Sequence, residues 1–187
     1  MSKHDSEDST EAPLGRPRAS DTIPLGGLLI GIFDLLFAFI FYGLILGVPP
    51  LRIFQSVAAG VLGRPTALEG GVRTFLLGIL LHFVVATCIA SVYFLATQFL
   101  PILVRHPVTS GLIYGVVAYF GMKFIVIPLS AIGQRPPLPR LTVLLTEVIG
   151  HAFLVGLPVA LLAQRSARAN KTNSADPAAV QPRLGSI

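Results

Sequence analysis

The sequence has few charged residues and only one cysteine, and each scarcity excludes a class of protein. Only 12% of the 187 residues are Asp, Glu, Lys or Arg, whereas 53% are hydrophobic. An average soluble domain carries about 25% charged residues, so this composition excludes an ordinary soluble domain. Cys88 is the single cysteine, so no intrachain disulfide can form, and we expect it to be a small packing residue.

Recognisable catalytic motifs are also missing. The sequence contains no phosphate-binding loop, dinucleotide fingerprint, HExxH motif or nucleophile elbow. The formal net charge is +5, but the basic residues are spread over both ends and the loops rather than gathered on one face, so no nucleic-acid partner is expected. These absences favour a non-enzymatic protein without a cofactor.

Long apolar segments dominate what is present. A helix that spans about 30 Å of hydrocarbon needs roughly 20 apolar residues. The segments that meet this length are residues 25–48, 74–100, 108–133 and 141–163. The later connections between them are short, which makes consecutive helices antiparallel neighbours. The sequence therefore predicts an all-α integral membrane protein, an antiparallel four-helix transmembrane bundle.

Both terminal segments are polar, and the basic residues outside the spans predict an orientation. Residues 1–24 and 165–187 lack apolar periodicity and are predicted to be disordered tails, and the first span is expected to be a retained helix rather than a signal peptide. The side with the termini carries Lys3, Arg16, Arg18, Arg105, Arg165, Arg168, Lys171 and Arg183, and the opposite side carries Arg52, Arg64, Arg73, Arg135 and Arg140. Because basic residues favour the cytoplasmic side, both termini are predicted to lie in the cytoplasm.

The first loop contains a second kind of helical pattern, at residues 51–62. Apolar side chains recur there at helical spacing, and the intervening residues are predicted to form a more polar face. The apolar set is Phe54, Val57, Ala58, Val61 and Leu62, and the other set is Arg52, Gln55, Ser56 and Ala59. We predict a short amphipathic helix that lies at the membrane interface.

Ionisable residues lie inside all four apolar segments: Asp34, His82, Lys123, Glu147 and His151. A charged group within the hydrocarbon costs about 3 kcal/mol, so these side chains are expected to face the protein interior. The helical rise places all of them in one layer less than about 10 Å thick. We predict that Lys123 pairs with Glu147 and that Asp34 lies near His151 or His82.

Small residues share helix faces with these polar groups, which indicates that the polar faces are packed against neighbouring helices. The sets with near-helical spacing are Gly27, Gly31 and Asp34; Gly78, His82, Ala86 and Ala90; and Gly111, Gly115, Tyr119 and Lys123. Pro128 and Pro158 lie within the third and fourth spans, where proline removes a backbone hydrogen bond and is predicted to bend the helix.

The polar layer has several interpretations. It can be a pathway for protons, ions or a small solute, or it can fix helix packing without chemistry. His82 and His151 are also predicted at similar depth, as a bis-histidine haem site would require. A carboxylate and histidine metal site is weaker, because Glu147 and His151 are four residues apart whereas di-iron bundles use a spacing of three.

A series of short motifs runs through the second half of the chain, from His82 to residue 165. They are GLIYG at residues 111–115, IPLSAIG at 127–133, a proline-rich loop, and TEVIGH at 146–151. With these motifs the second half resembles the YagU-like family of small bacterial inner-membrane proteins. The resemblance implies a four-span protein of the bacterial cytoplasmic membrane and adds weight to Glu147, Gly150 and His151.

These observations predict a multi-pass inner-membrane protein with a central polar cluster, supported by Tyr119, Gly115 and Gly150. The leading interpretation is a small transport or proton-linked membrane factor that acts on a proton or small solute. The alternative is a structural or accessory subunit of a larger membrane complex. Its partners would be the lipid bilayer and either another copy of the chain or other subunits of that complex.

Overall fold

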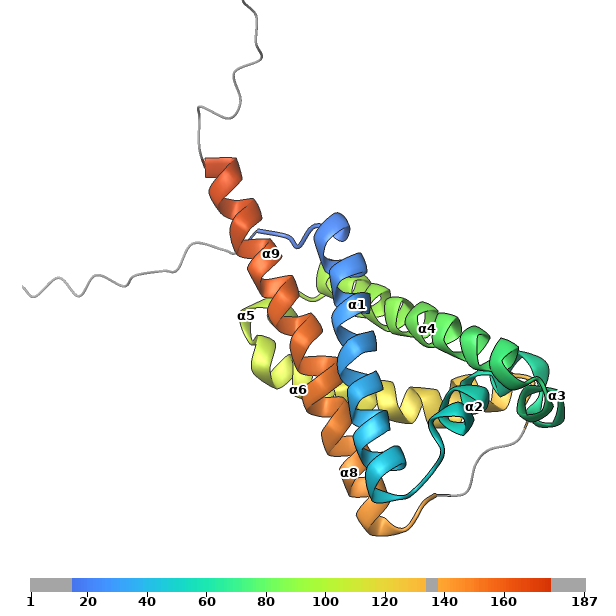
Figure 1. The fold of residues 1–187 in the computed structure, drawn as a ribbon. Helices are drawn as coiled ribbons and strands as arrows, with labels where there is room; N and C mark the ends of the chain where they lie inside the picture. Colours follow the sequence, from blue (N-terminus) through green and yellow to red (C-terminus); the bar gives the residue numbers. More distant parts are fainter. Residues whose placement is uncertain (1–14, 134–137, 176–187) are drawn as a thin grey trace, which may run out of the picture.

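The computed structural model describes residues 15–133 and 138–175, and all the regular elements in these residues are helices (Figure 1). Four helical segments are long and apolar enough to cross a membrane: Ala19–Ile45, Gly71–Phe99, Pro107–Leu129 and Leu141–Thr172. They contain the four predicted spans, apart from a few residues at span ends. The expectation of an all-helical protein with four such segments is therefore confirmed.

Three of the four segments change helix type along their length. The first consists of α1 (Ala19–Ala38) and the π-helix η1 (Phe39–Ile45), and the second is α4 (Gly71–Phe99) alone. The third consists of α6 (Pro107–Gly121), the π-helix η2 (Met122–Val126) and α7 (Ile127–Leu129). The fourth consists of α8 (Leu141–His151), the π-helix η3 (Ala152–Gly156) and α9 (Leu157–Ala175). Shorter helices are α2 (Pro50–Leu62), α3 (Arg64–Glu69) and α5 (Ile102–Arg105).

Two of the π-helices occur at the prolines that the sequence predicts to bend their spans. Pro128 follows η2 and Pro158 follows η3, each two residues after the π-helix ends. Proline lacks an N–H group and its ring clashes with the carbonyl four residues earlier, which belongs to the π-helix in both cases. The wider turn relieves that clash, since a π-helix bonds five residues apart. Ile127 N–H accordingly donates to the Met122 carbonyl, and Leu157 N–H to the Ala152 carbonyl.

Small side chains form the core where the long helices meet. α1 packs against α4 and α9, and α6 packs against η3 and α9 (Figure 1). The core contains Ile30, Ala86, Ala90, Tyr93, Val155, Val159, Ala160 and Ala163. Large apolar side chains such as Leu44 and Phe99, each 82% exposed, instead point outward. Small residues inside and large apolar residues outside are compatible with a hydrocarbon environment, because lipid tails solvate leucine while close helix packing requires small residues.

The two ends of the described chain pack against each other, which corrects the predicted tails. α1 begins at Ala19 and α9 continues to Ala175, so parts of the tails predicted at 1–24 and 165–187 are helical. The Arg18 N–H donates to Ser166 Oγ at 2.9 Å, and Thr22 and Ala167 are fully buried. The contact joins residues about 150 positions apart, so local composition could not predict it. Residues 1–14 and 176–187 lie outside the described residues.

The predicted role of Cys88 is wrong. The thiol is exposed rather than packed in the core. The buried face of α4 includes Ala86 and Ala90, and Cys88 lies two residues from each. At about 100° per residue this places it some 200° away from that face.

The predicted helix in the first loop is present as α2, but its buried face differs from the prediction. Gln55 and Ala59, expected on the polar side, are 0% and 2% exposed, whereas Val61 is 60% exposed. The Gln55 amide donates to the Gly71 carbonyl at 3.1 Å and to Thr74 Oγ1 at 3.3 Å. Tertiary hydrogen bonds thus turn this polar side chain toward α4, against which α2 packs.

Candidate functional site

Asp34 lies between two histidines that come from different helices. The carboxylate is on α1, with Oδ2 4.0 Å from His82 Nδ1 on α4 and Oδ1 4.0 Å from His151 Nε2 at the end of α8. Both separations exceed hydrogen-bond length, so the carboxylate is flanked by the imidazoles rather than bonded to them. The sequence prediction that Asp34 lies near His151 or His82 is confirmed for both residues.

The outer nitrogen of each ring is held by a backbone carbonyl. His82 Nε2 is 2.9 Å from the Gly31 carbonyl oxygen, and His151 Nδ1 is 2.9 Å from the Glu147 carbonyl oxygen. A carbonyl oxygen only accepts, so the nitrogen facing it carries the hydrogen. In a neutral imidazole the other nitrogen is then a bare acceptor. Both bare nitrogens face Asp34. The group formed by Asp34, His82 and His151 therefore has three acceptors, the carboxylate and the two ring nitrogens, with a place for a proton between them.

The carboxylate of Glu147 has a second set of partners. Its Oε1 accepts a hydrogen bond from the Tyr42 hydroxyl of η1, and its Oε2 accepts one from the Tyr119 hydroxyl of α6 at 2.5 Å. Lys123 Nζ lies 3.5 Å from Oε2 and donates to the Tyr119 hydroxyl at 3.2 Å. The predicted pairing of Lys123 with Glu147 is therefore confirmed. Opposite charge and hydrogen bonds together compensate for burial of the Glu147 carboxylate.

The two groups are neighbours connected through His151. Its Nδ1 faces the carbonyl of Glu147, and its ring lies edge-on to Tyr119 with 5.1 Å between ring centroids. All five predicted ionisable residues thus belong to one continuous region, and Tyr119 is part of it as expected. Tyr42 was missed. No sequence signal singled it out, because the direction of its side chain depends on the π-helix η1.

Gly115 and Gly150 let the helices around this region approach closely. A Cβ at Gly115 would overlap the backbone carbonyl of His151, and a Cβ at Gly150 would lie 2.8 Å from the Phe37 ring. Gly31, whose carbonyl holds His82, is likewise covered by the Phe83 ring, 2.5 Å from a Cβ built there. Gly31 therefore supplies the carbonyl that orients His82, and Gly115 and Gly150 allow close helix packing around His151.

Each π-helix carries or directly adjoins a polar residue of this region. Tyr42 belongs to η1, Lys123 to η2, and His151 immediately precedes η3. Single π-helical turns inside longer helices occur often at functional sites, because the wider turn changes the direction of side chains. Among the described spans, only α4, which carries His82, stays α-helical throughout.

This geometry does not favour the haem alternative. A haem iron would need a ring nitrogen from each histidine directed at one point, but the Asp34 carboxylate lies between the two ring nitrogens that could ligate it. In residues 15–133 and 138–175, no three His, Cys, Asp or Glu side chains are placed to hold a metal ion. The group instead suits a ligand as small as a proton.

The pairing of Glu147 with Lys123 leads to a prediction about stability. We expect Glu147→Gln to lower the free energy of unfolding by about 3 kcal/mol or more, because Lys123 remains as an unpaired buried charge. The double substitution Glu147→Gln with Lys123→Met should recover most of that loss, since no charge is left unpaired. Unfolding in detergent followed by circular dichroism measures both changes. Equal stability of the single and double variants would contradict the pairing.

Comparisons with protein-family models, curated proteins and solved structures find no match to this chain. The resemblance to the YagU-like family therefore stays a prediction.

Proposed function

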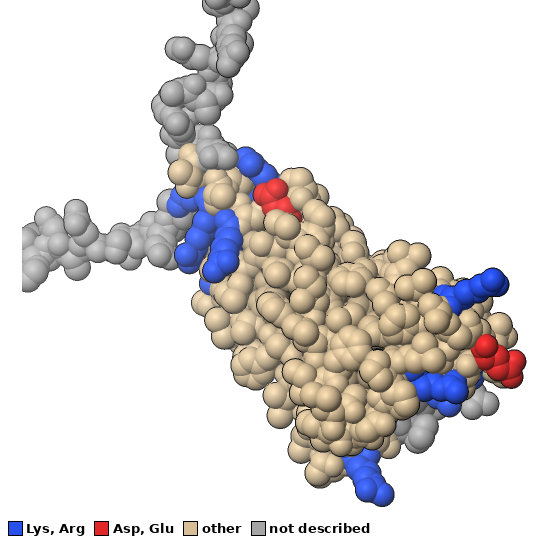
Figure 2. Space-filling view, in the orientation of Figure 1, with Lys and Arg blue, Asp and Glu red and all other residues tan. Residues whose placement is uncertain are grey.

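We propose that this protein is a multi-pass protein of a bacterial inner membrane whose polar layer binds and transfers protons or a small solute. In this proposal the four long helices cross the membrane as an antiparallel bundle, with both termini in the cytoplasm and α2 at the interface. The described residues near the chain ends include Arg16, Arg18, Arg105, Arg165, Arg168 and Lys171, and those at the opposite end include Arg52, Arg64, Arg73 and Arg140. Basic side chains lie at both ends of the molecule (Figure 2), and the larger set near the chain ends supports the orientation.

The observation that carries the proposal is the carboxylate of Asp34 between two inward-facing imidazole nitrogens. With no added proton the group has a charge of −1, which is costly within hydrocarbon. One proton shared between Asp34 and either imidazole makes the group neutral and creates a charge-assisted hydrogen bond. Glu147 and Lys123 are already neutral as a pair, so they do not compete for this proton.

The same geometry gives the proton two partners. Asp34 Oδ2 faces His82 on α4, whereas Oδ1 faces His151 on α8, so the carboxylate can exchange a proton across either helix interface. Imidazole can both accept a proton at one ring nitrogen and donate one at the other, which suits exchange with the carboxylate. The other ionisable groups facing this region are Glu147, Lys123, Tyr42 and Tyr119. Tyr42, Tyr119 and Lys123 all donate to the Glu147 carboxylate, so these four residues form one connected set.

Proton movement across liposomes tests this function. Purified protein is reconstituted with a pH-sensitive dye inside the vesicles, and a potassium diffusion potential drives any proton current. We expect the internal pH to change faster than in liposomes without protein. Small solutes added to one side under the same conditions test the wider form of the proposal.

One observation favours a second candidate, an accessory subunit of a larger membrane complex. The Glu147 carboxylate is already contacted by three donors, as expected for a group that only fixes helix packing. If liposomes stay tight to protons and to all tested solutes, and the protein purifies from membranes with a stoichiometric partner, the accessory function is supported and transfer is rejected.

A further inference from the structure

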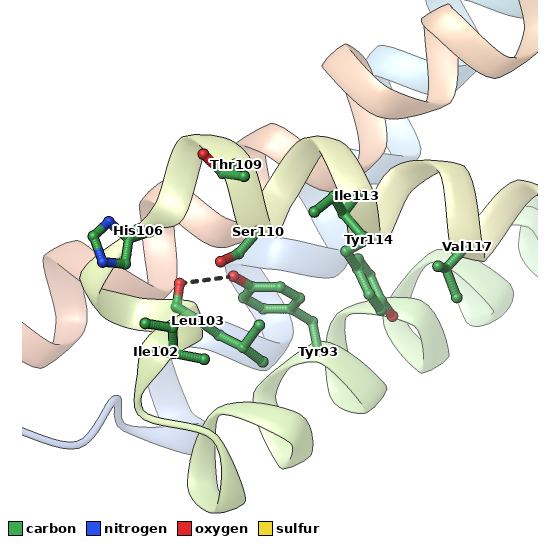
Figure 3. Close-up of a pocket in the computed structure, with 9 residues that line it drawn as sticks. All are labelled: Tyr93, Ile102, Leu103, His106, Thr109, Ser110, Ile113, Tyr114 and Val117. Atoms are coloured by element: carbon green, nitrogen blue, oxygen red, sulfur yellow. Dashed lines mark hydrogen bonds between the residues drawn. The ribbon is translucent and has the colours of Figure 1, made fainter.

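Away from the polar layer, a groove of about 440 Å³ runs along the outside of α4, α5 and α6 (Figure 3). Such a volume is within the range of small-ligand sites in proteins. The lining residues are Tyr93, Ile102, Leu103, His106, Thr109, Ser110, Ile113, Tyr114 and Val117. None of the five ionisable residues of the polar layer contributes to it, so this is a separate site.

The inner wall of the groove contains two tyrosines, but it offers no hydroxyl hydrogen to a ligand. The Tyr93 hydroxyl donates to the Leu103 carbonyl at 3.2 Å, and the Tyr114 hydroxyl donates to the Ile89 carbonyl at 2.6 Å. Both hydroxyl hydrogens are therefore used within the protein. Ile113 and Val117 are each 59% exposed, so the outer edge of the groove opens on the apolar surface of the helices. An apolar chain is the occupant that fits these walls.

Polar groups gather at one end of the groove only. His106, Thr109 and Ser110 lie at the start of α6, and Figure 3 shows Ser110 directed into the groove toward the hydroxyl end of Tyr93. From His106 to Val117 the chain advances 11 residues, or about 16 Å in a helix. Half of the hydrocarbon thickness of a bilayer is about 15 Å. The groove thus has the length and polarity gradient of one lipid chain in one leaflet.

The charge at the polar end of the groove favours an anionic head group. Arg105, in the last turn of α5, immediately precedes His106 and is exposed, and it lines an adjacent hollow with Arg16 and Pro17 rather than the groove itself. The described residues at this end of the molecule contain the basic side chains Arg16, Arg18, Arg105, Arg165, Arg168 and Lys171, against the acidic side chain of Asp21 (Figure 2). Basic sites between membrane helices attract anionic lipids at the membrane surface.

We propose that this groove holds one acyl chain of an anionic phospholipid from the leaflet nearest the chain termini. The phosphate of that lipid lies at the Arg105, His106 and Ser110 end. The chain runs past Tyr93 and Tyr114 toward Val117. The bound lipid covers the connection from α4 through α5 to α6.

Native mass spectrometry of protein released from nanodiscs tests the proposal, with phosphatidylglycerol and phosphatidylcholine in equal amounts. We expect the released protein to retain one phosphatidylglycerol in preference to phosphatidylcholine. Arg105→Gln should remove the preference, whereas Arg168→Gln, an exposed arginine at the same end on α9, should keep it. Ile113→Trp, which fills the groove, should abolish retention, whereas Ile149→Trp on α8, at a similarly exposed isoleucine, should not.

Three results would overturn the proposal. Equal retention of the two lipids by the unmodified protein shows only bulk lipid contact. Identical lipid preference of Arg105→Gln and Arg168→Gln shows that Arg105 does not hold the head group. Undiminished retention in Ile113→Trp, with circular dichroism showing a folded protein, shows that the lipid lies elsewhere.

Discussion

Asp34→Asn is expected to reduce proton movement across protein-containing liposomes to the rate of liposomes without protein. Asparagine has the size of aspartate but has no carboxylate to hold the proton between His82 and His151. Its amide nitrogen can donate to one of the two bare imidazole nitrogens, and its size matches aspartate, so the local packing is retained. Thermal unfolding should change little, by less than about 1.5 kcal/mol in free energy. The dye assay and an unfolding curve on the same preparation separate loss of function from loss of folding.

Asp21→Asn is the matched control for this substitution. Asp21 is the same residue type on the same helix, and it accepts hydrogen bonds from Ser20 at 2.9 Å and Ser166 at 3.4 Å near the chain ends. It lies outside the polar layer, so proton movement should persist in this variant. Undiminished proton movement in a folded Asp34→Asn protein would rule out Asp34 as the proton-binding group.

Gly115→Ala is expected to destabilise the protein by about 3 kcal/mol, although it adds a single methyl group. A Cβ at this position would overlap the His151 carbonyl and lie 2.6 Å from the Ala152 Cα. These are backbone atoms, so no side-chain rotation relieves the overlap, and α6 has to separate from η3. Because His151 moves with that backbone, proton movement should decline together with stability.

Gly121→Ala, on the same helix, is expected to have the opposite effect on stability. Among the described residues, no atom outside the local helix backbone lies within 4 Å of a Cβ built at Gly121. Alanine there should stabilise the helix by up to about 1 kcal/mol, since glycine is the poorer helix former. Unfolding of both variants in the same detergent measures the difference. Similar stabilities for the two variants would show that the contact between Gly115 and His151 does not limit helix packing.

The pairing of Lys123 with Glu147 illustrates how much of the site can be predicted without a structure. Both residues lie within apolar segments, and the helical rise places them at nearly the same depth. A buried lysine and a buried carboxylate at equal depth strongly favour each other, because either one alone is costly. Charge and depth were enough to predict this contact, and the structure confirms it.

Tyr42 and the orientation of the two histidines illustrate what could not be predicted. Tyrosine is common near membrane surfaces, so its presence in the first span gave no reason to place it against Glu147. The direction of its side chain also depends on η1. No proline follows η1 closely enough to predict a π-helix there, whereas Pro128 and Pro158 follow η2 and η3 two residues later. Similarly, the carbonyls of Gly31 and Glu147 that hold the histidines are backbone groups, which a sequence pattern does not distinguish.

The sequence by itself determined the helical class, the four long apolar segments and the depth of the ionisable residues. These properties add up along the chain, because each residue contributes its own hydrophobicity and the same helical rise. Only the tertiary structure decided which faces meet. It buried Gln55, exposed Cys88, packed the chain ends together and placed Asp34 between two imidazoles. Those outcomes depend on the rotation of each helix about its axis, which close glycine contacts and π-helical turns set in three dimensions.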